Sequence, residues 1–396
     1  MPDDALAMDP SAFRAADRLG GIELSEIVRI SERAKVLRDQ GRNVVALSTG
    51  EPDFPTPDFV VEAAHQAALA GETRYTATVG TPALREAIAQ EHGRQMAEVI
   101  VSTGAKQVLA NALMATLNPG DEVILPTPFW TSYADMVVVA GGRPVTVPCP
   151  MEAGFKLSPE ALEAAITPKT RWLMLNSPSN PSGAIYSARE IAALAEVLDR
   201  HPQVWVISDE IYAHLSFSPF VSFTAAAPAL APRTLIVSGV SKAWAMTGWR
   251  IGWGIGPAPL IKAMVSLQGQ STSGACSVAQ AAALAALNGP RDLLRDRCAI
   301  FQTRRDKVVA GLNALPGITC PVPDGAFYVF PSCKDALRQG ESDGGFCARL
   351  LDETDVAVVP GRAFGLSGHF RLSFAYSDDA LDAGLARLGD YLNKEA

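Results

Sequence analysis

The chain has 396 residues, and its 34 lysines and arginines against 42 aspartates and glutamates give a formal net charge of −8 at pH 7. A single hydrophobic core stops growing at about 250–300 residues, so this length predicts two domains. Hydrophobic residues make up 48% of the chain and charged residues 19%, which excludes a disordered protein, and the acidic balance argues against binding to nucleic acid or to an anionic membrane.

The chain carries no targeting or membrane signal that we recognise. Residues 1–10 are acidic and lack a basic region followed by an apolar one. The longer apolar stretches, such as residues 136–140 and 279–287, are far short of the ~20 residues that cross a bilayer. We therefore expect a soluble, cytoplasmic protein.

Short apolar runs rich in β-branched residues alternate with helical patterns through the middle of the chain. The strand-like runs are residues 98–102, 122–125, 171–175, 204–208 and 234–238. Helix start signals stand between them at Thr81-Pro82, at Ser158-Pro159, and at Ser187 with Glu190 as a capping box. This alternation is typical of βαβ units and predicts an α/β fold with a mostly parallel central sheet.

The last hundred residues follow a different pattern. Short strand-like pieces alternate there with helical segments, at residues 326–330, 356–359 and 370–374. The final helix follows Ser377 and carries a leucine every three or four residues. We predict a large domain at residues 50–290 and a small α+β domain built from both chain ends, residues 1–49 and 291–396.

The cysteines, histidines and glycines show none of the common metal or nucleotide motifs. The six cysteines form no CxxC pair and the five histidines no HExxH motif, so we expect reduced thiols and no protein-bound metal. Gly252, Gly254 and Gly256 lack both the GxGxxG spacing and the later acidic residue of a dinucleotide-binding loop.

Chemically useful side chains follow each of the five strand-like runs. They are found in Ser102 to Gln107, Phe129-Trp130, Asn176 to Pro181, Asp209 to Tyr212 and Ser241-Lys242. Because the ligand crevice of an open parallel sheet lies outside the carboxyl ends of its strands, we expect these segments to meet at one edge. An anion-binding turn, an aromatic ring, an amide, a carboxylate, a phenol and a lysine together favour a flat, phosphorylated, electron-withdrawing cofactor held by an amine.

Five motifs in a fixed order make the sequence recognisable. They are Gly50 to Phe54 (GEPDF), Asn176 to Gly183 (NSPSNPSG), Ser208 to Tyr212 (SDEIY), Ser238 to Trp253 (SGVSKAWAMTGWRIGW) and Phe370 to Tyr376 (FRLSFAY). From about Gly41 to Tyr376 the chain resembles the fold type I pyridoxal phosphate enzymes, and among them the class I aminotransferases of the aspartate/aromatic subgroup. The resemblance implies pyridoxal 5′-phosphate as cofactor and a small domain that closes over the cofactor-binding sheet.

The resemblance makes Lys242 the catalytic residue. It would hold the cofactor aldehyde as a Schiff base and, once displaced by substrate, move the proton between the substrate Cα and the cofactor. Schiff-base formation needs a neutral amine, so the pKa of Lys242 must fall well below its usual value of roughly 10.4. Burial and nearby cations such as Arg250 would lower this pKa.

Three further residues would contact the cofactor ring. Asp209 would pair with the pyridine nitrogen and keep it protonated, although an aspartate in this position is also a favoured helix N-cap. Tyr212 and Asn180 would hydrogen-bond the ring oxygen, and Asn180 also suits a turn before Pro181.

The phosphate is expected where backbone N–H groups face an anion at a helix start. The N–H groups in question are those of Gly104, Ala105 and Lys106. Lys106 departs from family members with Thr or Ser here, so the resemblance covers only its backbone. Arg250 would bind the phosphate through two hydrogen bonds, and Ser241 would add a hydroxyl, with Ser238 as the alternative.

The substrate would lie beside the ring. Arg371 would clamp its α-carboxylate with help from the Gly50 backbone, and Trp130 and Asn180 would line the same space. Trp130 would stack on the ring, although an aromatic residue after a strand is also typical of a core. Tyr75 matches the family tyrosine that reaches the phosphate of the neighbouring subunit, which implies an obligate homodimer with a shared active site.

The implied function is transfer of an amino group from an L-amino acid to a 2-oxo acid such as 2-oxoglutarate, by a ping-pong mechanism. A carbon–sulfur β-lyase of the same fold and an idle scaffold are the alternatives. Aspartate-specific relatives often carry Pro-Ser-Ala-Thr where this chain has residues 21–25, and a lysine where it has a position near Met114. We therefore expect a broad donor range that includes aspartate or aromatic amino acids.

Overall fold

A computed structural model of the chain describes residues 13–20, 22 and 26–395. Its largest sheet has seven strands, which are β2 Val99–Ser102, β3 Glu122–Thr127, β4 Arg143–Pro148, β5 Thr170–Asn176, β6 Trp205–Asp209, β7 Thr234–Gly239 and β8 Gly252–Ile255. Their order is β2-β8-β7-β6-β5-β3-β4. β8 is antiparallel to both neighbours, and all other pairs in the sheet are parallel, so the predicted mostly parallel α/β sheet is confirmed.

All five strand-like runs of the sequence form strands of this sheet, whereas the sequence pattern predicts neither β4 nor β8. β4 is an edge strand with two prolines, Pro144 and Pro148, and prolines are tolerated in sheets mainly at edges. β8 contains Gly252 and Gly254, which weaken any strand signal. A Cβ atom at Gly252 would overlap the backbone at Ala105, so the strand needs glycine to lie against that turn.

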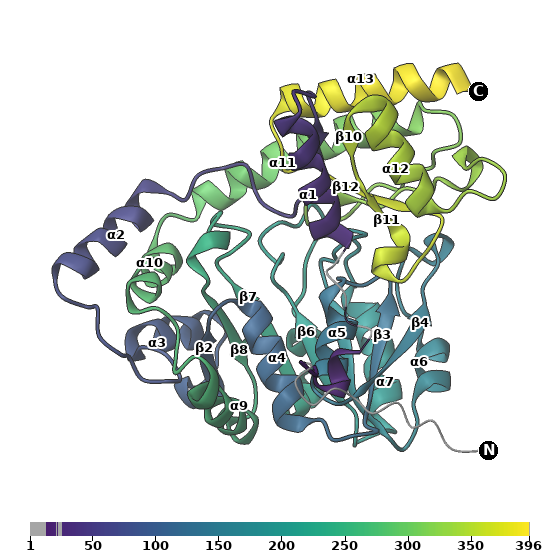
Figure 1. Cartoon of the computed structure of the whole chain (residues 1–396). Coiled ribbons are helices and arrows are strands. Elements are labelled where there is room, and N and C mark those ends of the chain that lie inside the picture. Colours follow the sequence, from purple (N-terminus) through teal and green to yellow (C-terminus); the bar gives the residue numbers. More distant parts are fainter. Residues whose placement is uncertain (1–12, 21, 23–25, 396) are drawn as a thin grey trace, which may run out of the picture.

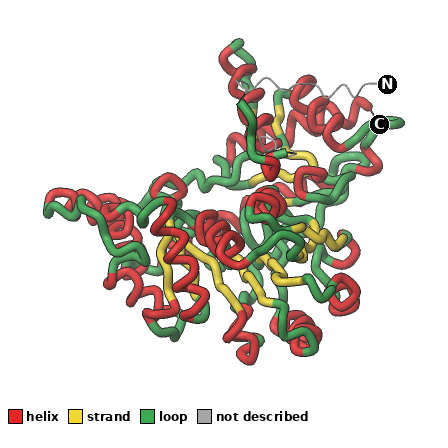
Figure 2. The backbone as a smooth tube through the Cα atoms, turned by 60° about the horizontal axis from the view of Figure 1, so that its bottom comes forward, coloured by secondary structure: helices red, strands yellow, loops and turns green. Residues whose placement is uncertain are grey.

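Helices cover both faces of the sheet, which explains why its strands are apolar runs (Figure 2). They are α2 Asp58–Leu69, α3 Pro82–Glu91, α4 Ala105–Thr116, α5 Ser132–Val139, α6 Pro159–Ala165, α7 Ala188–Asp199, α8 Phe223–Ala226, α9 Ala258–Ser271 and α10 Ser277–Asn288. The predicted helix starts are confirmed. Ser158 accepts a hydrogen bond from the Ala161 N–H, and Ser187 and Glu190 form the capping box.

A second, smaller layer contains the two remaining sheets. Its elements are α1 Glu26–Asp39, β1 Val45–Ala46, α11 Asp292–Asn313, β9 Tyr328–Val329, α12 Asp343–Thr354, β10 Val356–Ala357, β11 Val359–Pro360, β12 Phe370–Ser373 and α13 Asp378–Glu395. β1 pairs in parallel with β10, and β11, β12 and β9 form an antiparallel sheet. Segments from both chain ends therefore share this layer, while domain boundaries at residues 50 and 290 stay a prediction.

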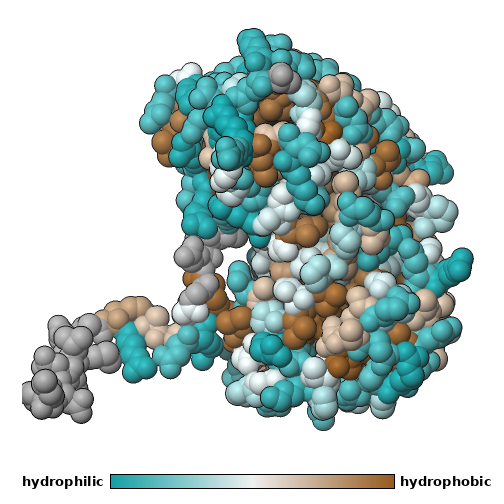
Figure 3. Space-filling model, turned by 90° about the vertical axis from the view of Figure 1, so that its right-hand side faces the viewer, coloured by the Kyte–Doolittle hydropathy of each residue, from teal (hydrophilic) through white to brown (hydrophobic). Residues whose placement is uncertain are grey.

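The seven-stranded sheet with its helices and the smaller layer lie at opposite ends of the molecule. Figure 1 shows α1, α11, α12 and α13 gathered at one end with the short strands, and the seven-stranded sheet with its helices at the other. In Figure 3, hydrophilic residues cover most of one face, and hydrophobic residues form separate small patches. Among the helices of the described residues, none is long and apolar enough to cross a membrane.

Candidate active site

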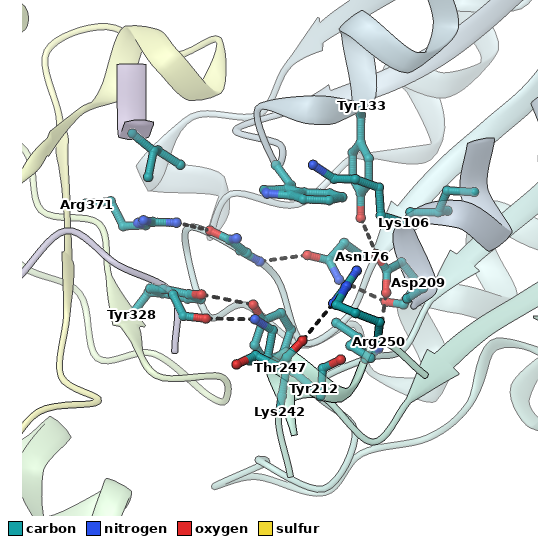
Figure 4. Close-up of a pocket in the computed structure, with 18 residues that line it drawn as sticks. Lys106, Tyr133, Asn176, Asp209, Tyr212, Lys242, Thr247, Arg250, Tyr328 and Arg371 are labelled. Atoms are coloured by element: carbon teal, nitrogen blue, oxygen red, sulfur yellow. Dashed lines mark hydrogen bonds between the residues drawn. The ribbon is translucent and has the colours of Figure 1, made fainter. Parts of the chain in front are cut away.

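A cavity of about 270 Å³ lies at the carboxyl ends of the central strands (Figure 4). Asp209 is the last residue of β6, Asn176 is the last of β5, and Lys242 follows β7. Eleven of the residues assigned from the sequence line the cavity: Gly50, Ala105, Lys106, Trp130, Asn180, Asp209, Tyr212, Ser241, Lys242, Arg250 and Arg371. Seven others also line it: Ile27, Leu109, Tyr133, Asn176, Ile211, Thr247 and Tyr328.

The amine of Lys242 lies in surroundings that favour its neutral form. Its Nζ donates a hydrogen bond to the Gly50 carbonyl at 2.7 Å. Burial lowers the pKa of Lys242 to about 8, and the positive charges of Arg371 and Arg250 act in the same direction against Glu51 and Asp209. The amine is therefore close to the condition in which it can act as a nucleophile at neutral pH.

The buried carboxyl group of Asp209 accepts two hydrogen bonds. Its Oδ2 accepts the Tyr133 hydroxyl at 2.7 Å, and its Oδ1 accepts the Ile211 N–H at 3.2 Å. Burial raises the pKa of Asp209 to about 6, although both hydrogen bonds and the nearby Lys242 oppose this rise. The alternative interpretation as a helix N-cap is wrong, because residues 211–214 form a turn and no helix starts there; the carboxylate caps this turn and also faces the cavity.

Arg371 is a buried cation without a carboxylate partner. Only 1% of its surface is exposed, and it forms no salt bridge with any described residue. Nη1 donates to Asn180 Oδ1 at 3.0 Å and Nη2 to the Ser48 carbonyl at 2.5 Å, while Nε has no partner. Burial lowers the pKa of Arg371. An uncompensated buried guanidinium is costly, so this position suits the carboxylate of a ligand.

Two tyrosines lie between Arg371 and Lys242. The hydroxyl groups of Tyr212 and Tyr328 are 3.0 Å apart, and the Arg371 guanidinium lies 4.6 Å from the centre of the Tyr328 ring. Burial raises the pKa of Tyr212, so its hydroxyl stays protonated and can donate a hydrogen bond. No described residue accepts a hydrogen bond from the side-chain Nδ2 of Asn180, which leaves a second donor beside Tyr212.

The turn before α4 is built to hold an anion. Gly104 has φ 83°, and a Cβ atom there would overlap the Arg250 guanidinium. Ala105 and Lys106 are the first two residues of α4, and their N–H groups lie beside this guanidinium. Gly104 does not line the cavity itself but holds this turn. Ser241 lines the cavity, whereas Ser238 lies within β7 and does not.

The side chain of Lys106 is a cavity residue that the sequence does not predict. Its Nζ lies 4.7 Å from the centre of the Trp130 ring, and it forms no salt bridge with a described residue. Burial lowers the pKa of Lys106, Arg250 lowers it further, and Asp135 opposes them. Met114, the position expected to replace a family lysine, is 49% exposed on α4 and does not line the cavity.

Two further expectations concern Tyr75 and residues 21–25. Tyr75 is 98% exposed and does not reach the site of its own chain. Of the specificity segment 21–25, the structure describes Ile22 alone, so that comparison lies outside the described residues. In the part of the chain that the structure describes, no group of three His, Cys, Asp or Glu side chains is placed to hold a metal.

Comparison with known proteins decides the family. The family model for aminotransferase class I and II matches residues 42–388. The chain belongs to this aminotransferase family. It is therefore a pyridoxal 5′-phosphate-dependent transaminase, which confirms the resemblance noted in the sequence.

Individual relatives agree with this assignment. The aminotransferase chain is 51% identical over 389 residues to the aspartate/prephenate aminotransferase of Cereibacter sphaeroides, with 94% of this chain and 97% of that protein covered. The crystal structure of the aspartate aminotransferase from Rhizobium meliloti superposes with a TM-score of 0.93 at 51% identity, covering 96% and 99% of the two chains.

The aspartate aminotransferase from Thermus thermophilus, solved with maleate, matches with a TM-score of 0.90 at 40% identity and covers 96% of this chain and 100% of that one. Since these relatives are named as aminotransferases, the β-lyase and scaffold alternatives are not favoured.

Proposed function

We propose that this aminotransferase is a cytoplasmic homodimer that takes the amino group of aspartate, and of aromatic amino acids, and passes it to a 2-oxo acid such as 2-oxoglutarate in a ping-pong cycle. One observation carries the choice of aspartate. Besides Lys242 and Arg250, which are assigned to the cofactor, the cavity is lined by two cations that form no salt bridge with a described residue, Arg371 at one side and Lys106 beside Trp130. A dicarboxylic substrate supplies one carboxylate for each.

The residues of the cavity fit pyridoxal phosphate. The turn formed by Ala105 and Lys106 offers N–H groups beside Arg250, and Lys242 offers an amine of lowered pKa. When bound, pyridoxal phosphate supplies an aldehyde carbon that accepts the amino group and a protonated ring that withdraws electrons from the substrate Cα.

The roles of the protein residues follow from their positions. Arg371 would hold the substrate α-carboxylate with both Nη atoms, and Trp130 would cover one face of the ring. Asp209 would hold a proton on the ring nitrogen, and Tyr212 and Asn180 would donate to the ring oxygen. Lys242 would take the proton from the substrate Cα and return it to the cofactor carbon, for which a pKa near 8 is suitable.

The choice of aspartate is tested by Lys106→Ala. Loss of one charged hydrogen-bond partner should reduce kcat/KM for aspartate by about 10–100-fold and leave kcat/KM for phenylalanine nearly unchanged. Met114→Ala is the matched control, because Met114 lies on the same helix outside the cavity. An equal loss for both amino acids would show that Lys106 does not bind the distal carboxylate.

The alternative chemistry has its own readout. A β-lyase releases pyruvate and ammonia from a substrate with a β-leaving group and needs no amino acceptor. We expect no such release above a few per cent of the transamination rate with cysteine as substrate. Rapid pyruvate formation without any 2-oxo acid would overturn the transaminase as the main activity.

The homodimer is supported by an open surface beside the cavity. A cavity of about 670 Å³, lined by Trp249, Val278 and Ala279 among others, adjoins Arg250, and Tyr75 is fully exposed. We propose that a second copy covers this surface and brings its own Tyr75 to the phosphate.

Mixing two inactive variants tests this arrangement. Tyr75→Ala and Lys242→Ala should each be nearly inactive, and after unfolding and refolding together they should recover about a quarter of the normal activity, because half of the dimers are mixed and each of those has one intact site. No recovery, or a fully active monomer, would contradict a shared site.

A further inference from the structure

Tyr133 is a buried tyrosine to which the sequence assigns no function. It lies in the first turn of α5, with 2% of its surface exposed, and its ring meets the edge of Trp130 at 5.5 Å. Its hydroxyl points to the end of β6 and donates to Asp209 Oδ2 at 2.7 Å (Figure 4). Within residues 26–395 no other side chain donates a hydrogen bond to the carboxylate of Asp209.

The surroundings of Asp209 show why this donor matters. The titratable groups that act on it or are acted on by it are Tyr133, Lys242, Tyr212 and Glu210. The carboxyl group of Glu210 turns away from the cavity and accepts hydrogen bonds from Ser208, Ser222 and the Phe223 N–H. Lys242 is committed to a different partner, since its amine donates to the Gly50 carbonyl.

We propose that Tyr133 is a positioning residue, whose hydroxyl fixes the orientation of Asp209 and keeps its carboxylate charged, so that Asp209 can hold the proton on the ring nitrogen of the cofactor. This inference rests on the role proposed for Asp209. It extends that role to the start of α5, because Tyr133 in the first turn of this helix then supplies the donor for the cofactor's counterion, and Trp130 just before the helix supplies the ring for the cofactor face.

The electrostatics agree with the geometry. Burial alone raises the pKa of Asp209, and the hydrogen bond from Tyr133 is the largest of the contributions that lower it. Without that hydroxyl, a larger share of Asp209 is protonated at neutral pH. A neutral carboxyl group stabilises a protonated ring nitrogen less well than a carboxylate does.

The test compares two cofactors on the apoenzyme, so that no reaction is involved. Pyridoxal phosphate has the ring nitrogen, and its 1-deaza analogue has a C–H group in the same place. Tyr133→Phe should weaken binding of pyridoxal phosphate by about 10-fold and leave binding of the deaza analogue unchanged or tighter. Equal weakening of both, or no weakening of either, would overturn the proposal.

Two further variants separate the possible failures. Tyr186→Phe removes another buried hydroxyl, one that accepts the Leu157 N–H and forms no hydrogen bond with Asp209, and should change neither affinity. Asp209→Ala should lose the preference for the ring nitrogen altogether. If Asp209→Ala keeps that preference, the proposed role of Asp209 is wrong; if it loses the preference and Tyr133→Phe does not, only the inference about Tyr133 is wrong.

Discussion

Two buried arginines in this aminotransferase, Arg349 and Arg371, have opposite surroundings. Arg349 lies on α12, with Nη2 2.8 Å from Glu341 and Nη1 paired with Glu395 of α13, and the hydrogen bonds that it donates to Glu341 raise its pKa. Arg371 lies on β12 against the cavity, without a carboxylate partner among the described residues, and burial lowers its pKa. The fold itself satisfies one cation and leaves the other for a ligand.

This difference separates residues that stabilise the fold from residues that bind. A buried charge with its partners in place contributes to one arrangement of the chain, and removing one partner is costly. A buried charge without a partner weakens the folded protein and is retained where a ligand completes it. Lys242 belongs with Arg371, because burial lowers its pKa and it forms no salt bridge with described residues; Lys106 shares both properties but is more exposed.

The largest effect is expected at Lys242. Lys242→Ala removes the amine that would form the cofactor linkage and move the proton, so turnover should fall by roughly 10⁴-fold or more. The apoprotein should be no less stable than the parent, because the lysine makes a single hydrogen bond in the cavity. Single-turnover kinetics and thermal unfolding measure the two quantities. Full activity in this variant would show that Lys242 is not the catalytic residue.

The two arginines can be exchanged for leucine one at a time. Arg371→Leu should lower kcat/KM for every amino acid by roughly 100-fold or more, since the α-carboxylate loses its partner, and should leave the free energy of unfolding of the apoprotein within about 1 kcal/mol. Arg349→Leu should leave kcat/KM unchanged and lower that free energy by about 2–3 kcal/mol.

Urea unfolding of the apoproteins and steady-state kinetics of the holoenzymes give both values. The comparison breaks down if Arg371→Leu unfolds as readily as Arg349→Leu, because Arg371 would then support the fold in the same way.

The rate at which Lys242 links to pyridoxal phosphate should depend on pH, and this dependence tests whether its surroundings differ from those of an ordinary lysine. Only the neutral amine of Lys242 reacts, so the rate of pyridoxal phosphate linkage to the apoenzyme should rise about tenfold per pH unit up to about 8 and then level off. Arg371→Leu removes a positive charge that lowers the pKa of Lys242, so its plateau should begin at a higher pH. An inflection near 10.4 in the parent enzyme would show that the lysine is not perturbed.

The sequence predicts the parts of this site that depend on strand ends. Lys242, Asp209 and Asn176 each follow an apolar run, and the carboxyl ends of parallel strands share one edge, so their meeting in one cavity follows from the pattern. The two layers and the helix starts are predicted for the same reason, because they depend on local periodicity and caps. The family is confirmed by comparison, while the roles of individual residues and the domain boundaries stay predictions.

The rest of the site depends on contacts between distant segments. Tyr133 stands three residues after Trp130, in the first turn of α5, but nothing local shows that the Tyr133 hydroxyl reaches Asp209. Tyr328 belongs to a short apolar strand whose sequence is typical of a hydrophobic core, and its hydroxyl meets Tyr212 only in the folded chain. The side chain of Lys106 could point to either side of a helix start, so only its backbone is predictable.

Tyr328→Phe is expected to have the smallest effect on activity. It tests whether a buried hydroxyl next to Arg371 acts on the cofactor or on the substrate. The change keeps the ring under the Arg371 guanidinium and removes only the hydroxyl that lies 3.0 Å from Tyr212. If Tyr328 acts on the ring oxygen through Tyr212, kcat should fall by about 3–10-fold while KM for aspartate, which reports on Arg371, stays unchanged. Tyr186→Phe is the matched control for a lost buried hydroxyl. A rise in KM with unchanged kcat would instead mean that the Tyr328 hydroxyl contacts the substrate carboxylate, and Arg371 would then share its ligand with a neutral donor.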